Sequence, residues 1–395
     1  MTNSSPSSVL KAVSAAVLCA ALGCAPGDGS RELEGGRAAF EAGDFKKAEK
    51  LLAKCAELSP TNVEAVVYLA RIKLQSGEIA EAGQYVARAA ALAGGDSDVR
   101  LLGAQVAWHL KDYARAADLF AGIADDASLD ASLRSQGWTG LGIVEMARND
   151  KGQDQTRYDL ARIAFIRAIR ADRRNASAYY HLGHLYRYAP FGYAEAALEQ
   201  FEIFVRLDPE TSSPRVQKTQ RSIIPGLKES ITRAATERPG AAHRNSAACM
   251  AVLSKAEEAL KKGNVKVARA CYKEACDADP LSFPAALGLA KAELKADSSV
   301  AGQRRAFESF RKACSLRPGA VSTLVETGLL AEKLALHAQA REIYSRAVAA
   351  NPASLDAVDG LIRSLGKTGD KSLKALAQAY QRYRDTLPTP KNRRR

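Results

Sequence analysis

Residues 43–60, GDFKKAEKLLAKCAELSP, decide the fold of this 395-residue chain. Ala48, Leu52 and Cys55 stand four and then three residues apart, a spacing that places all three on one face of an α-helix. A glycine–aspartate turn precedes the helix, and Pro60 marks its end because proline cannot continue a helix. The stretch therefore predicts the second helix of a helical hairpin.

The same spacing recurs along the chain. An alanine is followed four residues later by a large apolar or aromatic residue and, three residues beyond, usually by a small one. Eight triplets share this form: Ala48-Leu52-Cys55, Ala82-Val86-Ala89, Ala116-Phe120-Ile123, Ala161-Phe165-Ala168, Ala197-Phe201-Phe204, Ala268-Tyr272-Ala275, Ala306-Phe310-Ala313 and Ala340-Tyr344-Ala347. The first three alanines are 34 residues apart, as are the last two. A fixed period of this length indicates a stack of supersecondary units.

The units resemble the tetratricopeptide repeat (TPR) family, a helix–turn–helix of 34 residues. Repeat 1 carries the pattern as Gly36, Gly43, Asp44, Phe45, Ala48 and Pro60, and repeat 5 carries it as Tyr179, Leu182, Gly183, Tyr186, Ala197, Phe201 and Pro209. The resemblance covers about residues 29–209 and 246–388. It implies an all-α fold, a right-handed solenoid of stacked TPR hairpins.

Some units depart from the family pattern. Repeat 1 has Cys55, and repeat 5 the large Phe204, where a small residue is usual. Repeat 4 is lengthened by the polar stretch 151–157, and the last unit, 356–388, has a blurred second helix. These departures affect the expected local geometry and leave the expected fold unchanged.

The chain is expected to divide into two arrays. Residues 31–213 form an N-terminal TPR array of about five repeats, and residues 246–388 a C-terminal array of about four. Between them, prolines interrupt an amphipathic segment at 214–245, which is either a capping helix with a linker or a degenerate repeat. Residues 389–395 form a basic tail.

Charge also separates the two halves. The formal net charge is +13 for the whole chain, with −3 over residues 31–213 and +16 over 214–395. Such a basic half attracts anionic partners, here anionic lipid headgroups or an envelope polymer. The alternative is a solvated basic surface without a dedicated partner. No nucleic-acid recognition motif accompanies the charge, so nucleic acid is not expected as a partner.

The N-terminus has the features of an export signal. Lys11 precedes the apolar run 12–22, which is too short to span a bilayer and suits the core of a signal peptide over 1–23. The following Gly23-Cys24 resembles a bacterial lipoprotein cleavage box, which implies diacylation of Cys24 and a lipid-anchored tether over 24–30. No aspartate follows Cys24, which in that family favours the outer membrane, facing the periplasm of the cell envelope. An ordinary secreted form and a misassigned N-terminus are the alternatives.

Little in the sequence points to chemistry. No phosphate-binding loop and no hydrolase or metalloprotease motif is present, so the protein is expected not to be an enzyme, with no catalytic residues and no cofactor. His181 and His184 lack an apparent third ligand, and no metal site is expected. Cys249 and Cys276 stand at adjoining ends of one hairpin, where they either pack as small apolar residues or form a disulfide.

The remaining candidates lie on the concave groove that the family geometry implies. Its expected protein-binding residues are Arg37, Phe40, Arg71, Leu74, Trp108, Tyr180, His184 and Arg187. Cations flanked by apolar side chains suit a protein or peptide partner, which they hold by its carboxylates or carbonyls. For the apolar residues the alternative is packing between hairpins. The asparagine and lysine pair of dicarboxylate-clamp TPR domains is missing, so a chaperone-tail receptor is not inferred.

These features favour a membrane-tethered TPR scaffold that binds protein partners in the bacterial envelope. Resemblance to TPR lipoproteins implies a role in assembling a secretion, pilus or export machine. The alternative function is direct binding of an anionic polymer or lipid surface through the basic half.

Overall fold

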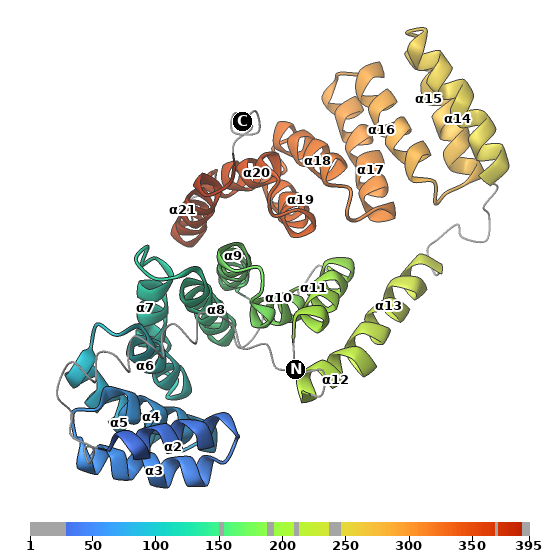
Figure 1. Cartoon of the computed structure of the whole chain (residues 1–395). Helices are drawn as coiled ribbons and strands as arrows, with labels where there is room; N and C mark the ends of the chain where they lie inside the picture. The colour runs from blue at the N-terminus through green and yellow to red at the C-terminus, as the bar shows by residue number, and fades with distance from the viewer. Residues whose placement is uncertain are drawn as a thin grey trace, which may run out of the picture. The chain divides into compact units, whose positions relative to one another are not determined.

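The computed structural model describes residues 29–149, 154–187, 193–208, 213–236, 246–367 and 370–388. Within these ranges the regular structure is helical without any strand, which confirms the predicted all-α solenoid (Figure 1). The helices are α2 (Ser30–Glu41), α3 (Phe45–Leu58), α4 (Val63–Ser76), α5 (Ile79–Ala93), α6 (Ser97–His109), α7 (Tyr113–Ala124), α8 (Ala131–Arg148), α9 (Gln155–Ala171), α10 (Ala176–Arg187), α11 (Ala194–Leu207), α12 (Pro214–Lys218), the π-helix η1 (Thr219–Ile223), α13 (Ile224–Thr236), α14 (Ser246–Lys261), α15 (Val265–Ala278), α16 (Phe283–Ala296), α17 (Val300–Leu316), α18 (Val321–Lys333), α19 (His337–Ala350), α20 (Leu355–Gly366) and α21 (Lys371–Asp385).

Contacts divide the chain into two compact units, unit 1 (Met1–Gly140) and unit 2 (Leu141–Arg395). Unit 1 holds the hairpins α2/α3, α4/α5 and α6/α7. Unit 2 holds α9, the hairpin α10/α11, the run α12–η1–α13, and the hairpins α14/α15, α16/α17, α18/α19 and α20/α21. This division differs from the sequence-based one, which separates two arrays at 214–245.

The hairpin turns follow from their sequence. Gly43 takes a φ of 79°, in the left-handed region where a glycine has no Cβ to clash, and Lys111 occupies the same place in α6/α7 at 62°. The next residue caps the second helix: the side chain of Asp44 accepts a hydrogen bond from the backbone of Lys47 at 3.1 Å. Asp112 caps α7 in the same way. Each turn therefore both ends one helix and begins the next.

Glycines on the first helices let the hairpins pack closely. Tyr344 of α19 is fully buried, and a Cβ at Gly360 of α20 would lie 2.2 Å from its ring. A Cβ at Gly328 of α18 would lie 2.6 Å from the same ring. The tyrosine thus contacts the first helices of two successive hairpins, and only glycine fits at either position.

The predicted inward face of the second helices is confirmed. Ala48, Leu52 and Cys55 are 0% exposed, and Phe204, the large residue in repeat 5, is 2% exposed. Phe204 packs with Val216 of α12. The large side chain of Phe204 therefore packs against the helical run that begins with α12, where a regular array would place the next hairpin.

That run, residues 214–236, continues through Pro225. The π-helical turn η1 stands directly before the proline, where the ring would otherwise clash with the preceding turn of an α-helix. Val216, Ile223 and Leu227 are buried, and α13 and η1 pack on α11. The interruption is thus part of the packed core of unit 2.

The helix α21 of the hairpin α20/α21 packs on α9, far before it in the sequence. At this contact Arg162 of α9 is 0% exposed. Its guanidinium donates to Asp159 at 2.5 Å, to Ser345 of α19 at 3.0 Å, and to the hydroxyl of Tyr380 of α21. The Tyr380 hydroxyl also donates to Asp159 at 3.1 Å. We call these four residues the Arg162 clasp.

Burial raises the pKa of Tyr380 well above its ordinary value, so its hydroxyl stays protonated as a donor. A second arginine of α9 extends the contact: Arg170 donates to the Thr386 hydroxyl at 2.8 Å and lies over the ring of Tyr383. The clasp and this pair hold α9, α19 and α21 together in unit 2.

Candidate functional site

In each unit the first helices of the hairpins carry polar and aromatic side chains, which we call the first-helix surface of that unit. In unit 1 it includes the predicted groove residues of α2, α4 and α6. Arg37 of α2 forms an ion pair with Glu64 of α4 at 3.8 Å, and Arg71 of α4 pairs with Asp98 of α6 at 3.2 Å. All four side chains are between 34% and 51% exposed, so the ion pairs are accessible to a partner.

The apolar groove candidates of unit 1 lie half-buried beside these cations. Phe40 makes an edge contact with Tyr68, with ring centroids 5.1 Å apart, and Arg71 lies over the Tyr68 ring at 5.6 Å. Leu74 packs against the core between α4, α5 and α6. The indole N–H of Trp108 is buried and has no hydrogen-bond partner within the described residues.

Unit 2 repeats the cation–carboxylate arrangement in its C-terminal hairpins. Lys291 of α16 pairs with Glu326 of α18 at 3.2 Å. At three junctions, then, a cation on one first helix is neutralised by a carboxylate on the next.

The junction of α10 with α12 is different. Tyr180, His184 and Arg187 project from α10, and α12 adds the exposed cations Arg215 and Lys218. The guanidinium of Arg215 lies 5.6 Å from the centroid of the Tyr180 ring. Among the described residues, neither Arg215 nor Lys218 forms an ion pair with a carboxylate. We call these five residues the α10–α12 site.

An aromatic cluster supports the site from below. The Tyr180 and His184 rings are 4.5 Å apart, and His184 packs edge-on against Phe201 of α11 at 5.0 Å. Burial, together with the charges of Arg187 and Lys218, lowers the pKa of His184 to about 4. His184 is therefore neutral at physiological pH.

His181 has the same properties. Burial lowers its pKa to about 4, with a contribution from the charge of Arg215, and its ring stacks on Phe165 at 5.8 Å. Within the part of the chain that the structure describes, no group of three potential metal ligands occurs. The rings of both histidines pack against phenylalanine rings.

Arg215 and Lys218 are not among the groove residues expected from the sequence. The spacing of the apolar residues Val216, Ile223 and Leu227 indicates that the helical run 214–236 is continuous and which of its faces is buried. Arg162 was not identified either. The nearby sequence signal for this arginine is Asp159, a possible ion-pair partner three residues earlier on the same helix.

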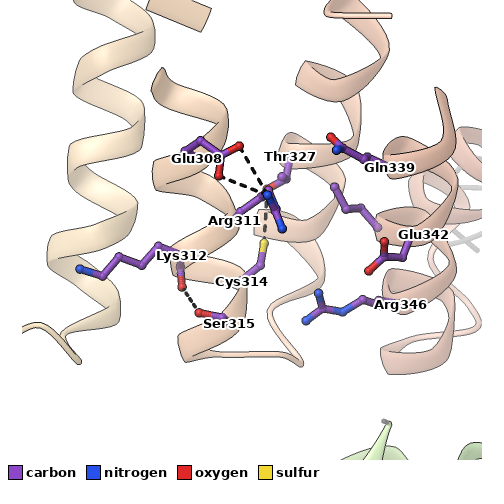
Figure 2. A pocket seen from close by; sticks show the side chains of 10 residues that line it. Glu308, Arg311, Lys312, Cys314, Ser315, Thr327, Gln339, Glu342 and Arg346 are labelled. Atoms are coloured by element: carbon purple, nitrogen blue, oxygen red, sulfur yellow. Dashed lines mark hydrogen bonds and ion pairs between the residues drawn. The ribbon is translucent and has the colours of Figure 1, made fainter. Parts of the chain in front are cut away.

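A pocket of about 480 Å³ opens between α17, α18 and α19 in the basic half of the chain (Figure 2). Its walls combine three cations, two carboxylates and several neutral side chains: Glu308, Arg311, Lys312, Cys314, Ser315, Thr327, Gln339, Glu342, Ile343 and Arg346. Arg311 is paired with Glu308 at 3.2 Å. Lys312 and Arg346 form no ion pair with a described residue, which leaves a positive excess in the pocket.

Cys249 and Cys276 are both buried thiols in one apolar cluster, and they form no disulfide in the structure. Burial raises the pKa of Cys276 to about 11, so the thiol is not ionised at neutral pH. Their arrangement agrees with the packing alternative. Cys24, the predicted lipidation residue, lies outside the described residues.

No helix in the described ranges has the length and apolar character needed to cross a bilayer. The helices pair instead into stacked hairpins, which defines the protein as a helical-repeat solenoid. Two family models described as tetratricopeptide repeat match the sequence, one over residues 39–106 and the other over residues 253–321. The chain therefore carries tetratricopeptide repeats in both of these stretches.

Three solved structures illustrate what the chain is similar to. The APC/C hetero-tetramer Cut9–Hcn1 is 16% identical over 92% of this chain and 81% of its own, with a TM-score of 0.35. PilF of Pseudomonas aeruginosa is 15% identical over 65% of this chain and 95% of its own, with a TM-score of 0.39. The TPR2AB domain of yeast Sti1, in complex with an Hsp90 peptide, is 13% identical over 89% and 98%, with a TM-score of 0.26. A search of curated proteins gives no match.

Tetratricopeptide repeats expose elongated surfaces that bind other proteins, and this chain is a protein-interaction scaffold of that kind.

Proposed function

We propose that the protein is a non-enzymatic scaffold that binds a protein partner along its first-helix surface. The observation that carries this proposal is the repeated pairing of accessible cations with half-buried aromatic and aliphatic side chains on successive first helices. A partner peptide gains apolar burial from Phe40 and Leu74, and its carboxylates compete with Glu64 and Asp98 for the arginines. Trp108 extends the same surface on α6.

A double charge reversal tests this assignment. Arg37→Glu with Arg71→Glu removes both cations, whereas Lys46→Glu with Lys50→Glu makes the same charge change on the exposed face of α3. We expect partner capture from envelope extracts to be lost only in the first variant, with helicity kept in both. Equal partner sets in the two variants would place binding elsewhere.

The proposed location is the bacterial cell envelope, with the protein lipid-anchored to the outer membrane and facing the periplasm. The apolar run 12–22 followed by Gly23-Cys24 supports this proposal. There the scaffold would aid assembly of a secretion, pilus or export machine. Cys24→Ala is expected to release the protein from membranes, and mass spectrometry should find an acylated N-terminal Cys24. A mature protein that retains Lys11 would contradict the anchor.

The pocket between α17 and α19 favours the alternative function, binding of an anionic polymer or lipid surface by the basic half. Lys312 and Arg346 supply the cations that a phosphate or carboxylate group needs. Lys312→Gln with Arg346→Gln should weaken binding to phosphatidylglycerol vesicles, and rising salt should weaken it further. Vesicle binding that is insensitive to both changes would exclude this site.

A further inference from the structure

At the α10–α12 site, Arg215 of α12 lies over the Tyr180 ring of α10, and Lys218 of α12 lies near His184. At the junctions α2/α4, α4/α6 and α16/α18, the second helix supplies a carboxylate to the cation of the first. At the junction of α10 with α12, α12 carries the cations Arg215 and Lys218 in place of such a carboxylate. No carboxylate of the described residues pairs with Arg215 or Lys218, so a partner's carboxylate can pair with these cations without displacing another one.

The packing of α12 fixes these two cations in place. Val216, which lies between them in sequence, is 0% exposed and packs between Tyr179 of α10 and Phe204 of α11. The Arg215 guanidinium is thereby held over the Tyr180 ring, and the Lys218 charge acts on His184. The site is therefore preorganised, which lowers the entropic cost of binding.

We propose that the surface formed by Tyr180, His184 and Arg187 of α10 with Arg215 and Lys218 of α12 binds a carboxylate-rich segment of a partner protein. The proposal rests on the scaffold function and names the chemistry of its partner at this junction. Carboxylates of the partner take the place that Glu64, Asp98 and Glu326 hold at the other junctions. The exposed part of Tyr180 receives an apolar side chain next to the acidic ones.

A glutamate-rich fluorescent peptide and its glutamine counterpart test this directly on the full chain. Arg215→Gln with Lys218→Gln removes the two cations of α12. The matched control is Lys228→Gln with Arg233→Gln, which makes the same charge change farther along the same helical run. In the control, Lys228 pairs with Glu202 and Arg233 with Glu229, so those cations are already neutralised.

We expect the first variant to bind the glutamate peptide roughly tenfold more weakly, the effect of losing two partly exposed ion pairs, and the control to change by less than about twofold. The glutamine peptide should not bind. Equal weakening in both variants would show that only net charge matters, and no weakening in either would show that the peptide binds elsewhere. Both results overturn the proposal.

His184 gives a second readout. A bound carboxylate opposes the cations Arg187 and Lys218, so it should raise the pKa of His184 from about 4. The chain has five histidines, and the His184 resonance can be assigned from its absence in His184→Gln. An unchanged His184 resonance at saturating peptide and neutral pH, where the glutamates are ionised, would contradict contact at this site.

Two further outcomes separate this inference from its alternatives. If phosphatidylglycerol vesicles compete for the site and lose affinity only in Arg215→Gln with Lys218→Gln, the occupant is a membrane surface and the peptide assignment is wrong. If the peptide fails to bind while Arg37→Glu with Arg71→Glu still abolishes partner capture, the scaffold function stands and the α10–α12 site does not.

Discussion

Replacing Arg162 by methionine should destabilise unit 2 by about 3–5 kcal/mol. The side chain is 0% exposed, and Asp159, which is 1% exposed, would be left as a buried carboxylate without its cation. Removing one partner of a buried ion pair costs about this amount because the remaining charge is neither solvated nor paired. Asp159→Asn with Arg162→Met removes both charges, so the double variant should recover a large part of the loss.

Denaturant unfolding of the full chain can resolve this effect by unit. Both tryptophans, Trp108 and Trp138, lie in unit 1, so their fluorescence follows unit 1 while circular dichroism follows all helices. Arg162→Met should shift only the part of the circular dichroism transition that fluorescence does not report. Hydrogen exchange should accelerate in α9, α19 and α21, which the clasp joins.

The matched control is Arg233→Met, which removes an exposed ion pair to Glu229 and should cost less than about 1 kcal/mol. The reasoning is refuted if Arg162→Met changes the unfolding free energy by no more than this control. It is also refuted if the double variant is less stable than Arg162→Met alone, since the cost would then not come from the unpaired carboxylate.

Three further predictions concern single positions. Gly360→Ala should destabilise unit 2, because overpacking against Tyr344 costs about 1–3 kcal/mol and exceeds the gain of up to about 1 kcal/mol in helix propensity; Gly366→Ala, with open space around it, should not destabilise, and thermal unfolding compares the two. Hydrogen bonds from a serine hydroxyl and an arginine lower the pKa of Asp126 from 3.8 to about 2, so its stabilising effect is present at neutral pH and lost as pH falls through that interval. Asp126→Asn should therefore lower the unfolding midpoint at neutral pH, and the difference should vanish near pH 2. Lys73→Met should lower the fluorescence-detected melting temperature of unit 1, because its ammonium contacts three carboxylates at 2.7 to 2.9 Å; an unchanged temperature would mean that these pairs contribute nothing.

The hairpins could be predicted from sequence because their causes are local. A triplet such as Ala197-Phe201-Phe204 fixes the buried face of its own helix, and Gly43-Asp44 supplies both the left-handed turn and the cap that starts the next helix. Period and turn chemistry act within one repeat, so they can be recognised without knowledge of the rest of the chain.

The Arg162 clasp could not be predicted because its partners are remote in sequence. An arginine on a helix is ordinarily exposed to solvent. Arg162 is buried only because α21 packs on α9. The same contact explains why the second helix of the last unit departs from the repeat pattern. Its tyrosines Tyr380 and Tyr383 pack on α9 and not on another hairpin.

Tyr180, His184 and Arg187 lie on α10, the first helix of its hairpin, and their role in binding stays a prediction. Arg215 and Lys218 lie on a helix that breaks the repeat pattern. The π-helical turn before Pro225 keeps that helix continuous, and a sequence pattern for regular α-helix does not represent it.

The residues of the Arg162 clasp are synthesised at well-separated times. Arg162 and Tyr380 are separated by 218 residues, so α9 emerges long before the helix that covers its arginine. Until α21 is synthesised, Arg162 and Asp159 remain hydrated. The core of unit 2 is therefore complete only after α21 has packed on α9. A truncation that removes Tyr380 would therefore leave the charges of Arg162 and Asp159 on α9 without this partner.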